Sequence, residues 1–354
     1  MNSSLLKTAL ILLIAASCGF AMSVGSASAA KSKADLYPYQ SAAFSSFITD
    51  SSLETKTSES QAFYAWFRLA YQHHPKAHLE QIANLDLALE KRREELLVIN
   101  NVAQKSTLEI KTASWLHGLV KTLIPKFSLD RGFEFTNALY FGERQCLLQS
   151  VLIAGLLQKM GVDAGTIMVW RSQSGEDSNN GHVVTLMKNV NRQDLIIDAS
   201  DKQPFMRHQG LFIYDSSLQD YRFVHPQFAA NGSILGYKRV ADGRLLQPAQ
   251  VEGLRVSYLR SQFYYYRGER VKDGFMGTPS TTSGLKTSAR LLETAQHLAP
   301  QNALAVYVLG HVYRRLGRLP QARAQYSKGY SLYKTQGFVP LEPGLAYKRW
   351  VQLP

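Results

Sequence analysis

The sequence lacks any long apolar run, which excludes a membrane-spanning helix of the roughly 20 residues that cross a bilayer. Its apolar stretch at 9–16 is much shorter, follows Lys7 and precedes small residues that end in Ala27-Ser28-Ala29. This is the pattern of a secretory signal peptide. We therefore expect residues 1–29 to be a cleaved leader and the mature chain to be exported, into the periplasm of a bacterium.

Cysteine is also scarce, because the chain has only Cys18 and Cys146. The segment from Ile14 to Cys18 resembles the lipobox of bacterial lipoproteins, so a lipid anchor at Cys18 is the alternative to cleavage after Ala29. Cleavage would leave Cys146 alone and exclude an intramolecular disulfide. An unpaired thiol in an oxidising compartment is either sealed in a core or kept for its reactivity.

Acidic residues are few relative to basic ones, and the formal net charge is +13. This balance favours anionic partners, such as cell-wall polymer, lipid head groups or acidic proteins, unless the basic surface serves only solubility. The sequence has no basic cluster of the kind that binds nucleic acid. It also has no acidic cluster near Cys146 with the spacing of a calcium loop. An apolar content of 45% excludes a disordered chain.

Residue patterns predict helical regions at the two ends of the chain and a central region that contains both helices and strands. Residues 30–104 are expected to form an N-terminal helical region, because their apolar residues recur with a helical period. Residues 105–270 mix helical and β-like segments, in which 212–214 and 221–224 could add strands and Phe263–Tyr266 could be a strand or an aromatic surface.

A stretch rich in Gly, Ser, Thr and Pro follows at 271–284. Such a composition is typical of a linker. We expect this linker to lead to a second helical region at 285–354.

An almost wholly apolar helix is predicted from Cys146 to Leu157, with Gly161 as its C-terminal stop. Three runs rich in Val, Ile and Thr follow at 166–170, 182–187 and 195–198, separated by polar turns. These runs predict strands of an antiparallel sheet. A central helix on such a sheet is an α+β arrangement.

Three polar residues meet in this prediction. Cys146 begins its helix, where free backbone N–H groups and the helix dipole favour a thiolate. If the turn between the last two strands is centred on Val190, His182 and Asp198 oppose each other with Cβ atoms roughly 4.5–5.5 Å apart. The carboxylate can then hold one ring nitrogen of His182 and leave the other for Cys146. The alternatives are a core cysteine, a structural histidine and a turn aspartate.

The order of these motifs resembles the transglutaminase-like superfamily over roughly residues 110–205. The motifs are the cysteine at the head of an apolar helix, Gly181-His182-Val183-Val184, and Ile196-Ile197-Asp198-Ala199. The resemblance implies a papain-like core, which is a central helix on an antiparallel sheet. It also implies Cys146 as the nucleophile, His182 as the general base and acid, and Asp198 as the residue that orients the imidazole.

The residues before the nucleophile differ from this family pattern. The sequence has Glu143-Arg144-Gln145 where many relatives have a glycine and an aromatic or small polar residue. The candidates for the oxyanion donor are therefore the Gln145 side chain and the N–H group of Cys146.

The C-terminal region resembles a tetratricopeptide repeat. The residues that match its consensus spacing are Leu309, Gly310, Tyr313, Gly317, Ala322 and Tyr326, with Gly329 where alanine is usual. Small residues let two antiparallel helices approach closely, and tyrosines fill the gap between them. We expect this helical hairpin to pack on the catalytic domain, either as a site for a protein partner or as a structural cap.

Two functions stay open on this basis. The first is a thiol hydrolase or acyltransferase that acts on amide bonds of a protein or peptide, with cell-wall peptide as an alternative substrate. The second is a non-catalytic scaffold that binds partners in the cell envelope. Neither requires a cofactor. A metal site at His73, His74 and His78 is disfavoured, because Pro75 interrupts the helix that would align them.

Overall fold

The computed structural model describes residues 35–57 and 61–353, with the backbone alone for 178–180. The expected leader and Cys18 lie outside these residues. Residues 32–354 belong to one compact unit. Among the described residues, no helix is both long enough and apolar enough to cross a membrane.

Helices form the N-terminal part of the chain: α1 (Ala42–Thr55), α2 (Ala62–Gln72), the 3₁₀ turn η2 (Pro75–Ala77), α3 (Leu85–Val98) and α4 (Val102–Leu123). The side chains of Ser41, Asn84 and Asn101 cap α1, α3 and α4 by accepting backbone N–H groups of the first turn. Aromatic side chains of α1 and α2 pack edge to face against the next helix after α4, as Phe44 and Phe63 do against Phe135.

A short segment connects these helices to the centre of the fold. It contains β1 (Lys126–Phe127), α5 (Phe135–Phe141) and β2 (Glu143–Arg144), and β1 pairs with β2 in parallel. The next element is α6 (Cys146–Lys159), whose residues from Cys146 to Leu157 are all buried. Its burial on every side and the left-handed φ of Gly161 confirm the predicted central helix and its stop.

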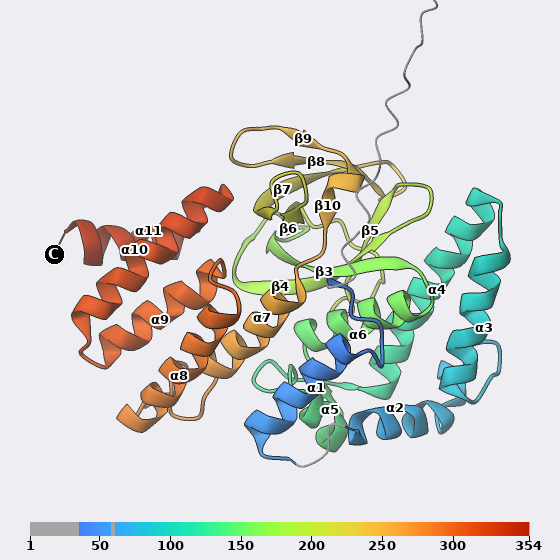
Figure 1. The fold of residues 1–354 in the computed structure, drawn as a ribbon, viewed down its shortest axis with the longest axis horizontal. Helices are drawn as coiled ribbons and strands as arrows, with labels where there is room; N and C mark the ends of the chain where they lie inside the picture. The colour runs from blue at the N-terminus through green and yellow to red at the C-terminus, as the bar shows by residue number, and fades with distance from the viewer. Residues whose placement is uncertain (1–34, 58–60, 354) are drawn as a thin grey trace, which may run out of the picture. The chain divides into compact units, whose positions relative to one another are not determined.

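The strands are β3 (Asp163–Arg171), β4 (Asp177–Lys188), β5 (Asp194–Ile197), β6 (Gly210–Asp215), β7 (Asp220–Phe228), β8 (Ile234–Arg239), β9 (Leu245–Leu246) and β10 (Val251–Glu252). They pair in the order β6-β3-β4-β5-β8-β7, and β7 pairs again with β6. Six antiparallel strands therefore close into a barrel, while β9 and β10 extend it from β8 and β6. Figure 1 shows the strands above α6, which packs against β3 and β4.

The prediction of a papain-like core, with a central helix on an open antiparallel sheet, is wrong. The sheet closes on itself, and its interior holds a separate apolar core that contains Ile167, Val184, Ile213 and Val224. Residues on the outer face of the same strands, such as Met168 and Val183, belong to the larger core shared with the helices. Strand alternation supplies both cores. The α+β class of the prediction is unaffected.

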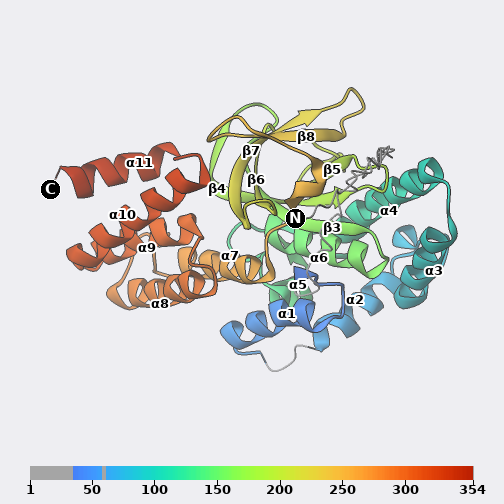
Figure 2. The same ribbon diagram turned by 45° about the horizontal axis from the view of Figure 1, so that its top comes forward.

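The chain returns to helices after the barrel: α7 (Val256–Glu269), α8 (Thr282–Leu298), α9 (Ala303–Arg315), α10 (Leu319–Gln336), α11 (Leu341–Tyr347) and the π-helical turn η4 (Lys348–Gln352). The aromatic run Phe263–Tyr266 thus lies on helix α7, and the predictions of a strand or an aromatic surface are wrong. In Figures 1 and 2, α8–α11 lie on the opposite side of the barrel from α3 and α4.

The pair α9 and α10 approaches closely at glycine. A Cβ on Gly310 would lie 2.9 Å from the Tyr326 ring, and one on Gly329 would lie 3.4 Å from Tyr307. The region also contacts the barrel, because Phe338 lies 4.4 Å from Trp170 of β3, centroid to centroid. These helices are therefore packed on the barrel rather than separated from it.

Candidate active site

Cys146 is the first residue of α6, as the sequence predicts. The preceding chain reaches this point through Gly142, whose left-handed backbone ends α5, and through the pairing of β2 with β1. Gln145 caps α6, and its Oε1 accepts the Leu147 amide N–H at 3.4 Å. The thiol therefore lies at the positive end of the helix dipole and is 6% exposed.

His182 and Asp198 are in direct contact. The Nε2 atom of His182 lies 2.7 Å from Oδ2 of Asp198. The observed register pairs Lys188 with Asp194 and Thr185 with Ile197, so the turn is centred on Asn191 and not on Val190. His182 and Asp198 are consequently diagonal neighbours. A one-residue shift of the turn centre changes the register by two, which leaves both side chains on the same face.

The other ring nitrogen of His182 is left for the thiol. Burial raises the pKa of Cys146, but the hydrogen bond and the charge of His182 lower it more, and the net pKa lies below its ordinary value. Burial lowers the pKa of His182, but hydrogen bonds to Asp198 and Cys146 raise it to about 10. Both directions favour a thiolate beside an imidazolium. The arrangement can therefore supply a nucleophile for a carbonyl carbon and a proton donor for the leaving group bonded to that carbon.

Asp198 has a second histidine partner that the sequence did not reveal. Nε2 of His208 lies 3.0 Å from the same Oδ2 atom, and Oδ1 accepts the Ser200 amide at 2.9 Å. Burial raises the pKa of Asp198, but hydrogen bonds from His182 and His208 hold it well below its usual range. Asp198 is thus an anion across the working pH range. His208 lies in the loop before β6, and no spacing in the sequence links it to the other residues.

One cavity of about 460 Å³ contains the predicted residues Cys146, His182 and Gln145. Its other walls come from Leu129-Asp130, from Tyr266 of α7 and from residues of the segment 270–277. The segment expected to act as a linker therefore contributes a wall of the cavity. An enclosure of this size can accept a polypeptide segment or a small molecule.

Gln145 can act as an oxyanion donor through only one of its amide atoms. Only Nε2 can donate a hydrogen bond to an oxyanion, because Oε1 is an acceptor and already accepts the Leu147 N–H group. Tyr266 is a further donor that the sequence did not reveal. Its hydroxyl lies 3.8 Å from Sγ of Cys146.

A metal ion is the alternative for the histidines of this site. Among the described residues, ligand atoms of His182, Asp198 and His208 lie within 4.8 Å of one another. A metal-bound histidine normally donates its other N–H to a nearby acceptor. In the described part of the chain, Nδ1 of His208 is buried without a hydrogen-bond partner. The contacts favour hydrogen bonding over metal binding. At the N-terminal end, Nδ1 of His74 and Nε2 of His78 bond backbone carbonyls instead.

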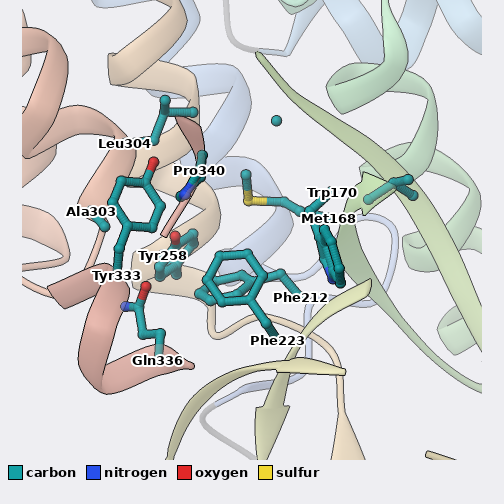
Figure 3. Close-up of a pocket in the computed structure, with 12 residues that line it drawn as sticks. Met168, Trp170, Phe212, Phe223, Tyr258, Ala303, Leu304, Tyr333, Gln336 and Pro340 are labelled. Carbon is teal, nitrogen blue, oxygen red and sulfur yellow. The ribbon is translucent and has the colours of Figure 1, made fainter. Parts of the chain in front are cut away.

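A second, smaller cavity of about 40 Å³ lies between the barrel and the C-terminal helices. Figure 3 shows its aromatic lining, with Trp170, Phe212 and Phe223 facing Tyr258 and Tyr333. Gly181, the residue before His182, also lines it. Gly181 has a φ of +68°, a left-handed conformation that favours glycine. By volume the cavity holds roughly three water molecules.

Comparisons with known proteins do not assign this site. No protein-family model matches the chain, and a search of curated proteins finds no significant match.

Proposed function

We propose that the chain is a thiol enzyme that hydrolyses or transfers the acyl group of an amide bond in a protein or peptide. Cys146 is the nucleophile, His182 gives and takes the proton, and Asp198 orients the imidazole. The thiolate attacks the amide carbonyl, the amine leaves with a proton from His182, and an acyl-thioester remains on Cys146. Water or a second amine then resolves the thioester.

One observation carries this proposal. The thiol at the N-terminus of α6 and the imidazole of His182 line one cavity of about 460 Å³. This histidine is also bonded at 2.7 Å to the buried carboxylate of Asp198. A structural cysteine needs none of these neighbours. The order of the motifs, which resembles that of the transglutaminase-like superfamily, supports the same chemistry.

The size of the cavity supports a protein or peptide substrate, and the basic balance of the chain is consistent with cell-wall peptide as the alternative. The close-packed hairpin of α9 and α10 is the part of the chain that we propose for a protein partner.

A non-catalytic scaffold is the second candidate function. The observation in its favour is the burial of Cys146, which leaves the thiol 6% exposed. In that case the barrel and the C-terminal helices would serve only to bind partners in the cell envelope.

We also propose export of the chain. The basic residue Lys7, the apolar stretch 9–16 and the small residues before Ala30 support cleavage after Ala29, and a lipid anchor at Cys18 is the alternative. In either case the protein acts outside the cytoplasm.

Thiol alkylation separates the enzyme from the scaffold. In the native protein, iodoacetamide should modify Cys146 below about pH 8, because an activated thiol has a depressed pKa. The His182→Ala variant should lose this reactivity by roughly tenfold or more at pH 6, since each unit of pKa is a factor of ten. Asp198→Asn should slow the reaction less, because it mainly loosens the orientation of the ring.

His225→Ala is the control, because this half-buried histidine of β7 bonds the Gln209 carbonyl and does not line the cavity that contains Cys146. It should leave the pH profile of alkylation unchanged. If Cys146 reacts only after denaturation, or if His182→Ala has the profile of the wild type, the scaffold takes the place of the enzyme.

A further inference from the structure

Tyr266 is held rigidly beside the nucleophile. Its ring is 1% exposed, lies 5.5 Å from the Phe133 ring in a stacked arrangement, and has the Arg270 guanidinium 4.7 Å from its centroid. These contacts and the burial of the ring restrict its movement. The direction of its hydroxyl is thus set by the fold.

The hydroxyl lies between the nucleophile and the strand that carries the base. It is 3.8 Å from Sγ of Cys146 and donates a hydrogen bond of 3.1 Å to the Gly181 carbonyl. Gly181 directly precedes His182. The hydroxyl also faces the cavity that contains Cys146 and His182.

We propose that the Tyr266 hydroxyl is a catalytic hydrogen-bond donor to the oxyanion that forms when Cys146 attacks a carbonyl group, a role that rests on the proposed function. As the S–C bond forms, the π pair of the carbonyl moves onto its oxygen. The Tyr266 O–H turns from the Gly181 carbonyl to this oxygen. When the pair returns, the C–N bond breaks and the amine leaves with the proton of His182.

Distance and charge support this assignment. The carbonyl oxygen of an attacked substrate lies close to Sγ, and a hydroxyl 3.8 Å from the sulfur can reach it at the roughly 2.7–3.1 Å that oxyanion donors require. An oxyanion is a stronger acceptor than the neutral Gly181 carbonyl, so the hydrogen bond gains strength as charge develops. Such a differential interaction accelerates the chemical step.

Burial keeps the donor protonated. Desolvation raises the pKa of Tyr266 well above its ordinary value, and the nearby Cys146 charge raises it further. The hydroxyl therefore retains its hydrogen wherever the thiolate is formed. Together with Nε2 of Gln145, the Tyr266 hydroxyl gives the cavity two hydrogen-bond donors that lie far apart in the sequence.

The test uses p-nitrophenyl acetate, an activated ester whose acyl transfer passes through the same oxyanion and releases p-nitrophenolate. Tyr266→Phe should lower the acylation rate constant by roughly 100- to 1,000-fold, the range for loss of one oxyanion donor. Alkylation by iodoacetamide forms no oxyanion. It should change little in the same variant, when measured on the pH plateau where the thiol is fully ionised.

Tyr265→Phe is the matched control, because Tyr265 is equally buried at 1% and donates to Glu269 instead of facing Cys146. It should leave acylation unchanged, and urea unfolding of both variants reports any common loss of stability. Equal loss of acylation and alkylation in Tyr266→Phe, or no loss of acylation, overturns the role of Tyr266. If Cys146→Ala reacts with the ester as fast as the wild type, the proposed function itself fails.

Discussion

Asp198 receives three hydrogen bonds, from the Ser200 amide, His182 and His208. Burial acts to raise its pKa, but the bonds from the two histidines lower it below the ordinary value. A carboxyl with a depressed folded pKa stabilises the fold above its unfolded pKa of about 3.9, and that contribution is lost as the pH falls through the folded value. Acid therefore weakens this site only far below neutral pH.

The role of His208 is to keep this carboxylate anionic and in place. His208→Ala should lower the free energy of unfolding at pH 7 by roughly 1.5–3 kcal/mol, the usual worth of a hydrogen bond to a charged group. His208→Gln, which restores a donor, should recover part of that loss. Urea unfolding of both variants gives the measurement, and equal losses would show that packing, not the hydrogen bond, explains the effect.

The sequence predicted Cys146, His182 and Asp198 because each lies on an element with a local pattern. The cysteine begins an apolar helix, His182 lies on β4, and Asp198 directly follows β5, which a short turn joins to β4. His208 and Tyr266 reach the site only through tertiary packing. A loop histidine and a tyrosine in an aromatic run carry no local sign of the carboxylate or thiol that they contact.

Among the elements, α6 determines where Cys146 lies, and α1 approaches this helix closely at Gly155. A Cβ on Gly155 would lie 2.7 Å from the Phe44 ring and 3.1 Å from the Tyr37 carbonyl. Gly118 of α4, by contrast, has no atom within 4 Å of such a Cβ. The glycine of α6 therefore allows close packing against α1, whereas the glycine of α4 has no such role.

Alanine substitutions at these two glycines should change the free energy of unfolding in opposite directions. Gly118→Ala should stabilise the protein by up to roughly 1 kcal/mol, because alanine is the better helix former. Gly155→Ala has the same gain, but overpacking against Phe44 costs about 1–3 kcal/mol. Its net effect should be destabilising. Thermal or urea unfolding compares the pair, and stabilisation by Gly155→Ala would mean that α1 yields easily.

The sequence indicated strands at 212–214 and 221–224 but not the closure of the barrel. Alternation along a strand identifies its two faces, whereas the pairing of β7 with β6 and β8 depends on contacts far apart in the chain. The prediction for Phe263–Tyr266 was wrong for a related reason. A helix buried on all sides has no apolar period, and its tyrosines imitate a strand.

At the scale of the whole molecule, export would set the first residue of the mature chain. Intact-mass measurement on protein from the cell envelope should give a chain that starts near Ala30 or Lys31, or a lipidated Cys18. Unprocessed Met1 in the cytosol would contradict both forms of the proposal.

The walls of the cavity that contains Cys146 come from residues as far apart in the chain as Leu129 and Gly277. Until the chain through residue 277 has folded, the cavity lacks one wall and Tyr266 is not held beside the sulfur. An unfinished chain therefore carries an ordinary thiol, which is mostly protonated at neutral pH. Formation of the cavity therefore couples the reactivity that we propose for Cys146 to folding of the chain through residue 277.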